Sequence, residues 1–290
     1  MKAAAIDDAL LRAWPLPPVD EGGDKESRGC VLVIAGSREI PGAAILAATA
    51  ALRAGAGKLV VATAQSAWQI VAAALPEARV IALPESAGGG LRLEGLDLLA
   101  SCGGDTAAVL VGPGMADAAA TCAFVQGLLP MFMEATVVLD ALAMDCVRAG
   151  TRFQQAVVLT PHAGEMAHLT GLEKEAIVAD PLRLAARHAE AWRAVVALKG
   201  ATTCIAGADG TPWRHESQTP GLGTSGSGDV LAGVIAGLAA RGATPEQAAV
   251  WGVALHSRAG EALARRSGSL GYLARELAAE IPALMEALAD

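Results

Sequence analysis

Short apolar runs alternate along this chain with longer segments of helical character. Eight runs are predicted as β-strands, because each is a short block rich in apolar and β-branched residues. They are residues 30–35, 58–62, 79–83, 107–111, 136–139, 156–159, 194–198 and 202–206. Most are apolar at consecutive positions, which is typical of parallel strands buried on both faces.

Helices are predicted between most of these strands. They cover residues 43–54, 66–75, 94–101, 117–129 and 180–192, and the chain is mostly helical from 228 onward. Gly55 and Gly57 follow the first helix, where glycine commonly ends a helix. This alternation predicts an α/β fold, a doubly wound and mostly parallel sheet flanked by helices and joined by right-handed crossovers.

The segment before the first strand differs from the rest of the chain. Residues 1–28 are polar and rich in proline around Trp14, so we expect an arm or short helix followed by a linker. Residues 29–290 contain no Pro- or Ser-rich linker, and we expect them to form a single domain without a separate lid. The arm and the Ala-rich region 245–288 could pack on another subunit or on their own sheet. We expect a homo-oligomer, a dimer or a tetramer.

In an open α/β sheet, ligands bind outside the carboxyl ends of the strands. The loops predicted at that edge are 36–42, 112–114, 161–165, 199–203 and 223–229, together with Asp140. We expect these segments, although far apart in sequence, to line one cleft.

The most informative stretch is residues 219–241, a loop of Gly, Ser and Thr that turns abruptly into an apolar helix. Glycines at 223, 226 and 228 allow backbone N–H groups to face a ligand. The positive end of the helix dipole lies at the same place, so the stretch is typical of an anion site. Asp229 would repel an anion, unless it acts as a base or meets a cation such as Mg²⁺. The alternative is an Asp N-cap after a glycine-rich loop.

His162, Glu165 and Lys199 are candidates in the neighbouring loops. His162 is predicted to contact substrate and Glu165 to lie near a metal or phosphate, or else both mark only a helix start. Lys199 follows a strand and precedes Gly200, so it is either a phosphate contact or an exposed turn lysine. We expect His168 on a helix face, and the remaining histidines to be structural or solvated (His188, His215, His256).

Composition and absent motifs narrow the classes of function. The net charge of −8 argues against general nucleic-acid binding. No apolar run reaches the roughly 18 residues of a membrane span, and no secretory signal is visible. The five cysteines have no zinc-like spacing, so we expect a reducing compartment, the cytoplasm. A P-loop, a Rossmann fingerprint and a G-x-S-x-G elbow are all missing, which disfavours those enzyme classes.

Taken in order, the motifs resemble those of the ribokinase-like superfamily, and within it the ADP/ATP-dependent NAD(P)H-hydrate dehydratases. The resemblance runs from about residue 29 to the end of the sequence. It is carried most specifically by Thr160-Pro-His-Ala-Gly-Glu165, Lys199-Gly-Ala-Thr-Thr203 and Gly226-Ser-Gly-Asp229. No epimerase segment precedes these motifs, so we expect a stand-alone repair domain.

The resemblance implies a reaction and a set of site residues. ADP or ATP would phosphorylate the ring hydroxyl of hydrated NADH or NADPH, and loss of phosphate would restore the dihydronicotinamide. Asp229 would be the catalytic base, and the hydrated dinucleotide would contact Ala43, Gly114, His162 and Asp229. The nucleotide would contact Lys199, Gly200, Ala201, Thr202, Thr203, Gly226, Ser227 and Gly228. Mg²⁺ would bridge the phosphates, with Glu165 near it.

Two positions depart from the family pattern. Leu142 stands where members usually carry a second Asp after Asp140, and Ile40 stands where many carry an aromatic residue. Two alternatives stay open. One is a kinase of the same superfamily that acts on the hydroxymethyl group of a vitamin precursor or a sugar. The other is a catalytically silent nucleotide-binding protein.

Overall fold

The computed structural model describes residues 3–18, 22–217 and 219–289, and the remaining parts of the predicted arm and domain lie outside this description. Within it, ten strands form one sheet in the order β1-β10-β9-β8-β7-β6-β5-β2-β3-β4. All pairings are parallel except those of β9 with β8 and β10. The strands are β1 (Ala4–Ala5), β2 (Cys30–Ile34), β3 (Lys58–Ala64), β4 (Arg79–Leu83), β5 (Thr106–Val111), β6 (Thr136–Leu139), β7 (Val157–Leu159), β8 (Val195–Leu198), β9 (Thr202–Ala206) and β10 (Pro212–Glu216).

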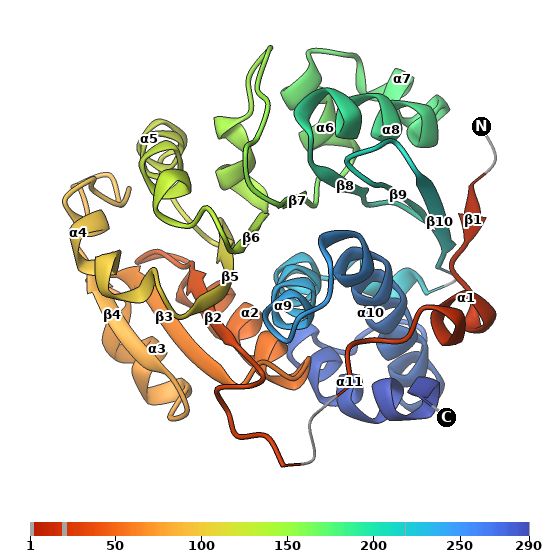
Figure 1. Cartoon of the computed structure of the whole chain (residues 1–290), viewed down its shortest axis with the longest axis horizontal. Helices are drawn as coiled ribbons and strands as arrows, with labels where there is room; N and C mark the ends of the chain where they lie inside the picture. The colour runs from red at the N-terminus through yellow and green to blue at the C-terminus, as the bar shows by residue number, and fades with distance from the viewer. Residues whose placement is uncertain (1–2, 19–21, 218, 290) are drawn as a thin grey trace.

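Helices cover both faces of this sheet (Figure 1). One layer holds α2 (Pro41–Arg53), α3 (Trp68–Ala74), α9 (Ser227–Ala240), α10 (Pro245–Ser267) and α11 (Ala274–Ala289). The other holds α4 (Gly95–Leu99), α5 (Ala118–Leu128), α6 (Ala163–Thr170), α7 (Lys174–Ala179) and α8 (Pro181–Trp192). None of the described helices combines the length and the hydropathy that crossing a bilayer requires. The prediction of a doubly wound, mostly parallel α/β sheet is confirmed.

The central strands divide their side chains between two cores. On β2, Val31 and Val33 pack with α2 and α9, whereas Leu32 and Ile34 pack with α5 on the opposite face. All four side chains are fully buried. Burial on both faces explains why this strand is apolar at every position, as the sequence pattern predicts.

Small residues bring α9 very close to α2. A Cβ at Gly233 would lie 2.2 Å from the carbonyl oxygen of Ala47, and one at Gly237 would lie 2.3 Å from that of Ala51. Only glycine allows this approach of two backbones. The packing fixes α9 centrally over the sheet and therefore sets the position of its N-terminus.

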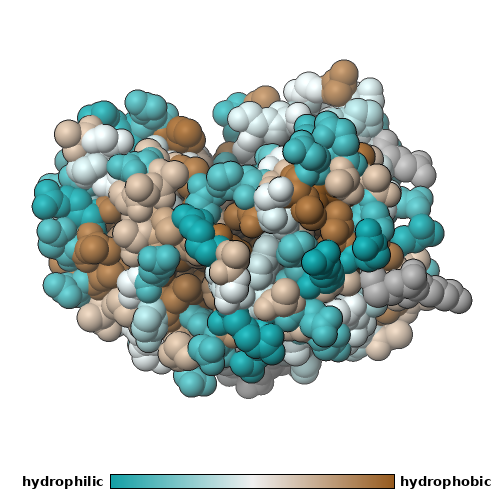
Figure 2. Space-filling model, turned by 90° about the horizontal axis from the view of Figure 1, so that it is seen from above, coloured by the Kyte–Doolittle hydropathy of each residue, from teal (hydrophilic) through white to brown (hydrophobic). Residues whose placement is uncertain are grey.

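The described part of the N-terminal arm packs on its own chain. It contains a short helix, α1 (Asp8–Ala13), and β1, which extends the sheet beside β10. Trp14 stacks on Trp213 with ring centroids 5.9 Å apart, and the indole N–H of Trp251 donates to the Trp14 carbonyl over 2.8 Å. The helices of region 245–288, α10 and α11, likewise pack against α9. On the face drawn in Figure 2, hydrophobic residues are interspersed with hydrophilic ones.

Candidate active site

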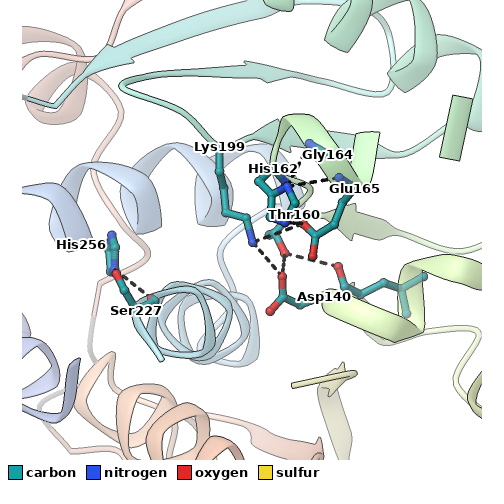
Figure 3. Close-up of polar contacts among 9 residues, drawn as sticks. Asp140, Thr160, His162, Gly164, Glu165, Lys199, Ser227 and His256 are labelled. Carbon is teal, nitrogen blue, oxygen red and sulfur yellow. Dashed lines mark hydrogen bonds and ion pairs between the residues drawn. The ribbon is translucent and has the colours of Figure 1, made fainter. Parts of the chain in front are cut away.

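Side chains from three strand ends meet at the carboxyl edge of the sheet (Figure 3). Asp140 follows β6, Thr160 follows β7 and Lys199 follows β8. The Lys199 Nζ lies 3.1 Å from Oδ1 of Asp140, and the Thr160 hydroxyl donates to the same oxygen over 2.7 Å. The predicted convergence of these strand-end segments is confirmed, and Lys199 is not an exposed turn lysine.

Lys199 is a charged group held in a largely buried place. Its side chain is 20% exposed, and that of Asp140 is 4% exposed. Burial disfavours the ammonium form, but the carboxylates of Asp140, Glu165 and Asp229 outweigh it and raise the pKa of Lys199. Lys199 therefore remains positive, and a methyl group placed on Gly228 would lie 3.5 Å from its Nζ. The cation stands beside the N-terminus of α9, where the helix dipole adds positive potential.

Asp229 occupies the first turn of α9 and is half-buried. Burial, together with the nearby negative charge of Asp140, raises the pKa of Asp229 to about 6, although Lys199 acts in the opposite direction. A carboxyl with this pKa is ionised at neutral pH and still binds a proton readily. These are the properties of a general base.

His162 both begins α6 and presents a donor to the cleft. Its Nδ1 accepts the backbone N–H groups of Gly164 and Glu165 over 3.0 and 3.1 Å. Glu165 Oε2 in turn accepts the N–H of His162 over 2.7 Å, which completes a capping box. Because Nδ1 accepts, the neutral imidazole carries its proton on Nε2. The helix-start and ligand-contact interpretations of this segment are therefore compatible.

A cavity of about 780 Å³ opens beside Lys199 and the N-terminus of α9. The residues predicted to bind nucleotide or substrate that line it are His162, Lys199, Gly200, Ala201, Thr203, Ser227 and Gly228. Thr202, Gly226 and the predicted base Asp229 are not among its lining residues. Six further lining residues belong to the predicted stretch 219–241: Thr219, Pro220, Leu222, Gly223, Thr224 and Leu231. The structure adds five that sequence reasoning missed as part of a site: His215, Ser217, Val253, His256 and Ser257.

His256 forms hydrogen bonds with Ser227, the first residue of α9. Its Nε2 lies 3.0 Å from both the hydroxyl and the carbonyl oxygen of Ser227. Burial lowers the pKa of His256 to about 4, so the ring is neutral at neutral pH. The expectation of a structural histidine is confirmed. Its pairing with Ser227, 29 positions earlier in the chain, appears only in the folded protein.

Ala43 in the first turn of α2 and Gly114 in the loop after β5 lie together, outside the lining of the cavity. Gly114 has φ +63°, and a Cβ there would lie 2.5 Å from that of Ala43 and 2.9 Å from the carbonyl oxygen of Ile40. The N–H of Gly36 donates to the Pro113 carbonyl over 2.7 Å and joins the two loops. Ala43 is only 2% exposed, so these two small residues pack closely against each other between the loops.

Leu142 lies in a short 3-10 helix, Ala141–Cys146, directly after Asp140. Its side chain is partly buried. The preceding Ala141 has φ +48°, a left-handed conformation that costs a non-glycine residue about 1 kcal/mol or more. This turn directly follows Asp140 in the chain.

The carboxylates suit a metal that arrives with the nucleotide. Among the described residues, no group of three or more His, Cys, Asp or Glu side chains could hold a metal ion. Mg²⁺ commonly binds through one or two carboxylates together with substrate phosphates and water. Asp140, Glu165 and Asp229 surround Lys199 closely enough to influence its pKa, so acidic oxygens are available where such a metal would arrive.

Comparisons with known proteins identify the family of this chain. The family model described as NAD(P)H-hydrate dehydratase matches residues 31–283. The chain is 47% identical over 287 residues to ADP-dependent (S)-NAD(P)H-hydrate dehydratase of Xanthomonas campestris, covering 99% of this chain and 98% of that protein. It spans about half the length of bifunctional NAD(P)H-hydrate repair enzymes that it also matches.

Two solved structures share the whole fold. ADP/ATP-dependent NAD(P)H-hydrate dehydratase from Bacillus subtilis, co-crystallised with ATP and Mg²⁺, superposes with a TM-score of 0.82 at 28% identity, covering 99% of each chain. A ribokinase-like superfamily protein from Enterococcus faecalis gives 0.83 at 27% identity, covering 99% of this chain and 96% of that one. The fold is therefore ribokinase-like, and the chain belongs to the NAD(P)H-hydrate dehydratase family.

Proposed function

We propose that this chain is an ADP-dependent lyase that restores NADH or NADPH from its hydrated form. The ring hydroxyl attacks the terminal phosphorus of ADP, a new P–O bond forms, and AMP leaves. The carbon–oxygen bond of the phosphorylated ring then breaks, phosphate departs, and loss of a ring proton restores the dihydronicotinamide. Family membership and the name of the Xanthomonas relative support this reaction.

The position of Asp229 is the observation that carries the proposal. A carboxyl with a pKa of about 6 stands in the first turn of the helix whose N-terminus would hold phosphate. It would take the proton of the attacking hydroxyl. Such a base contributes roughly 10²–10⁴ in rate.

The charge that develops on the transferring phosphoryl group would be stabilised by the backbone N–H groups at 226–228 and by Lys199. Asp140 and Thr160 orient the Lys199 ammonium through the contacts described above. We propose that the nucleotide contacts Lys199, Gly200, Ala201, Thr202 and Thr203 on one side and Gly226, Ser227 and Gly228 on the other.

The hydrated ring would lie toward Ala43 and Gly114, within reach of Asp229 and of the His162 Nε2–H donor. Mg²⁺ bound to the nucleotide would neutralise phosphate charge. Glu165 is proposed to approach it, directly or through water, because its carboxylate is only 26% exposed and faces Lys199.

Further proposals concern the domain organisation of the protein, its location in the cell, its assembly and the alternative functions. We propose that residues 29–290 form the dehydratase domain and residues 1–28 an arm, and that the protein acts in the cytoplasm as a homo-oligomer. The net charge of −8 supports a small-molecule enzyme without nucleic-acid partners. Family membership favours the dehydratase over a vitamin or sugar kinase. The Asp229–Lys199 arrangement favours an active enzyme over a silent nucleotide-binding protein.

Incubating the purified protein with hydrated NADH or hydrated NADPH, Mg²⁺ and either ADP or ATP tests this function. We predict recovery of the dihydronicotinamide absorbance, with release of phosphate in equal amount and AMP formation when ADP is the donor. Omitting the nucleotide should abolish recovery. Absence of recovery from both hydrates with both donors would contradict the proposal.

A further inference from the structure

The contact between His256 and Ser227 determines which of the two side chains donates the hydrogen bond (Figure 3). The His256 Nε2 atom lies 3.0 Å from the hydroxyl oxygen of Ser227 and 3.0 Å from its carbonyl oxygen. A carbonyl oxygen can only accept, so Nε2 carries a proton. In the opposite tautomer, the lone pair of Nε2 would face the carbonyl oxygen with no proton between them.

The Ser227 hydroxyl is therefore an acceptor toward His256. Burial lowers the pKa of His256 to about 4, and the positive charge of Lys199 acts in the same direction, so the ring is neutral at neutral pH. Its Nε2–H is shared between the two oxygens of Ser227, a three-centre arrangement that is common at helix ends. A protonated Nε2 cannot accept, so the hydroxyl proton of Ser227 points away from His256 and needs another partner.

Ser227 stands where a phosphate group would bind. It is the first residue of α9, and it is one of the residues that line the cavity of about 780 Å³. A methyl group on the next residue, Gly228, would lie 3.5 Å from Nζ of Lys199. A cation beside a helix N-terminus attracts phosphate, whose oxygens accept hydrogen bonds. The acceptor that a ligand brings to this place is therefore a phosphate oxygen.

We propose that His256 is a positioning residue of the nucleotide site: it donates to Ser227 and so directs the Ser227 hydroxyl to donate to a phosphate oxygen of the nucleotide. This inference rests on the proposed nucleotide site and adds His256 to it. Without the Nε2–H donor, the hydroxyl loses the partner that fixes its rotamer. It then points at the phosphate for only part of the time.

The contact with phosphate is tested by calorimetric binding of ADP and of adenosine, without hydrated substrate. We predict that Ser227→Ala weakens ADP binding by about tenfold, as expected when a hydrogen bond to a charged group is lost. Adenosine, which has no phosphate, should bind this variant and the wild type equally. An unchanged ADP affinity, or an equal loss for adenosine, would overturn the proposal.

A double-mutant cycle tests whether His256 acts through the Ser227 hydroxyl. His256→Leu should weaken ADP binding severalfold in the wild type and cause no further loss in Ser227→Ala. His256→Gln should retain most of the wild-type affinity, because its amide N–H can replace Nε2–H. If His256→Leu does not fold, His256→Asn takes its place, since its shorter side chain withdraws the donor. Equal losses in both backgrounds would mean that His256 only supports the helix, and would overturn the positioning role.

His188→Leu is the matched control for the loss of a histidine. His188 packs against Trp192 on α8, with ring centroids 4.8 Å apart, and is not among the residues that line the cavity. Its ADP affinity should equal that of the wild type, and a loss as large as that of His256→Leu would contradict the assignment. If ADP affinity follows the predicted pattern but no hydrate is repaired, the positioning role stands and the proposed function fails.

Discussion

At the scale of single residues, the site depends on charged side chains that are largely buried. Asp229 and Lys199 could be identified from the sequence because each lies beside glycine at a strand or helix end. Asp140 could be seen as a strand-end residue, but its bond to Lys199, 59 positions away, could not be inferred from spacing. His215 and Ser257 gave no local signal, because neither belongs to a recognisable motif of charge and glycine.

The raised pKa of Asp229 has a consequence for stability. The folded protein holds this proton up to about pH 6, whereas the unfolded chain releases it near the ordinary aspartate pKa of 3.8. The folded state therefore binds more protons between these values, and its stability falls as pH rises through this window. Above about pH 6 the wild-type protein carries the full cost of an ionised buried carboxylate.

Asp229→Asn should consequently be more stable than the wild type at neutral pH, by about 1–3 kcal/mol, and equal to it below about pH 4. Urea unfolding at a series of pH values measures the difference. Glu77→Gln, at an exposed position, serves as the control and should show little dependence. A stability difference that is constant from pH 4 to 8 would contradict the burial of the Asp229 charge.

At the scale of elements, the apolar parallel strands were predictable and the mixed ones were not. β10 contains Pro212, Arg214 and Glu216, and its exposed and buried positions alternate, so it lacks the continuous apolar run of a central strand. β1 has only two residues, too few to show a period. Both are added at the β9 edge of the sheet, where pairing partners rather than local pattern decide the structure.

The close packing of α9 on α2 gives a prediction at this scale. Gly237→Ala would place a methyl group 2.3 Å from the Ala51 carbonyl oxygen. Because the obstacle is backbone, the helices must separate, and we expect a loss of roughly 1–3 kcal/mol in the free energy of unfolding. Thermal and urea denaturation measure this loss.

Gly42→Ala is the matched control on α2, because nothing lies within 4 Å of a Cβ at that position. We expect this change to raise stability by a few tenths to about 1 kcal/mol, since it reduces the freedom of the unfolded chain. Similar effects of the two substitutions would show that the α2–α9 approach is not tight in solution.

At the scale of the whole molecule, the doubly wound order explains why distant segments share one site. β6, β7 and β8 are neighbours in the sheet and run parallel, so the residues that follow them meet at one edge. This edge could be predicted from the sequence by counting alternating elements. The cavity wall from β10 and α10 could not, because it forms only when β10 pairs with the antiparallel β9 and α10 packs over both.

The arm adds a connection between the two ends of the chain. Arg258 of α10 bonds Asp8 of α1, and the Ile6 carbonyl holds the ring of His215. Ile6 and Asp8 thus lie directly behind a wall of the proposed nucleotide site. Their contribution is structural support for that wall, a role that the polar, proline-rich sequence of the arm did not indicate.

The central claim is that Asp229 is the base that activates the hydroxyl of the hydrated ring. Its most direct test is kcat for ADP-dependent repair by Asp229→Asn, measured with nucleotide affinity determined on the same preparation. We predict that kcat falls by about 10²–10⁴ while ADP binding stays close to that of the wild type. A kcat within roughly tenfold of the wild-type value, with ADP bound normally, would contradict the assignment of Asp229 as the base.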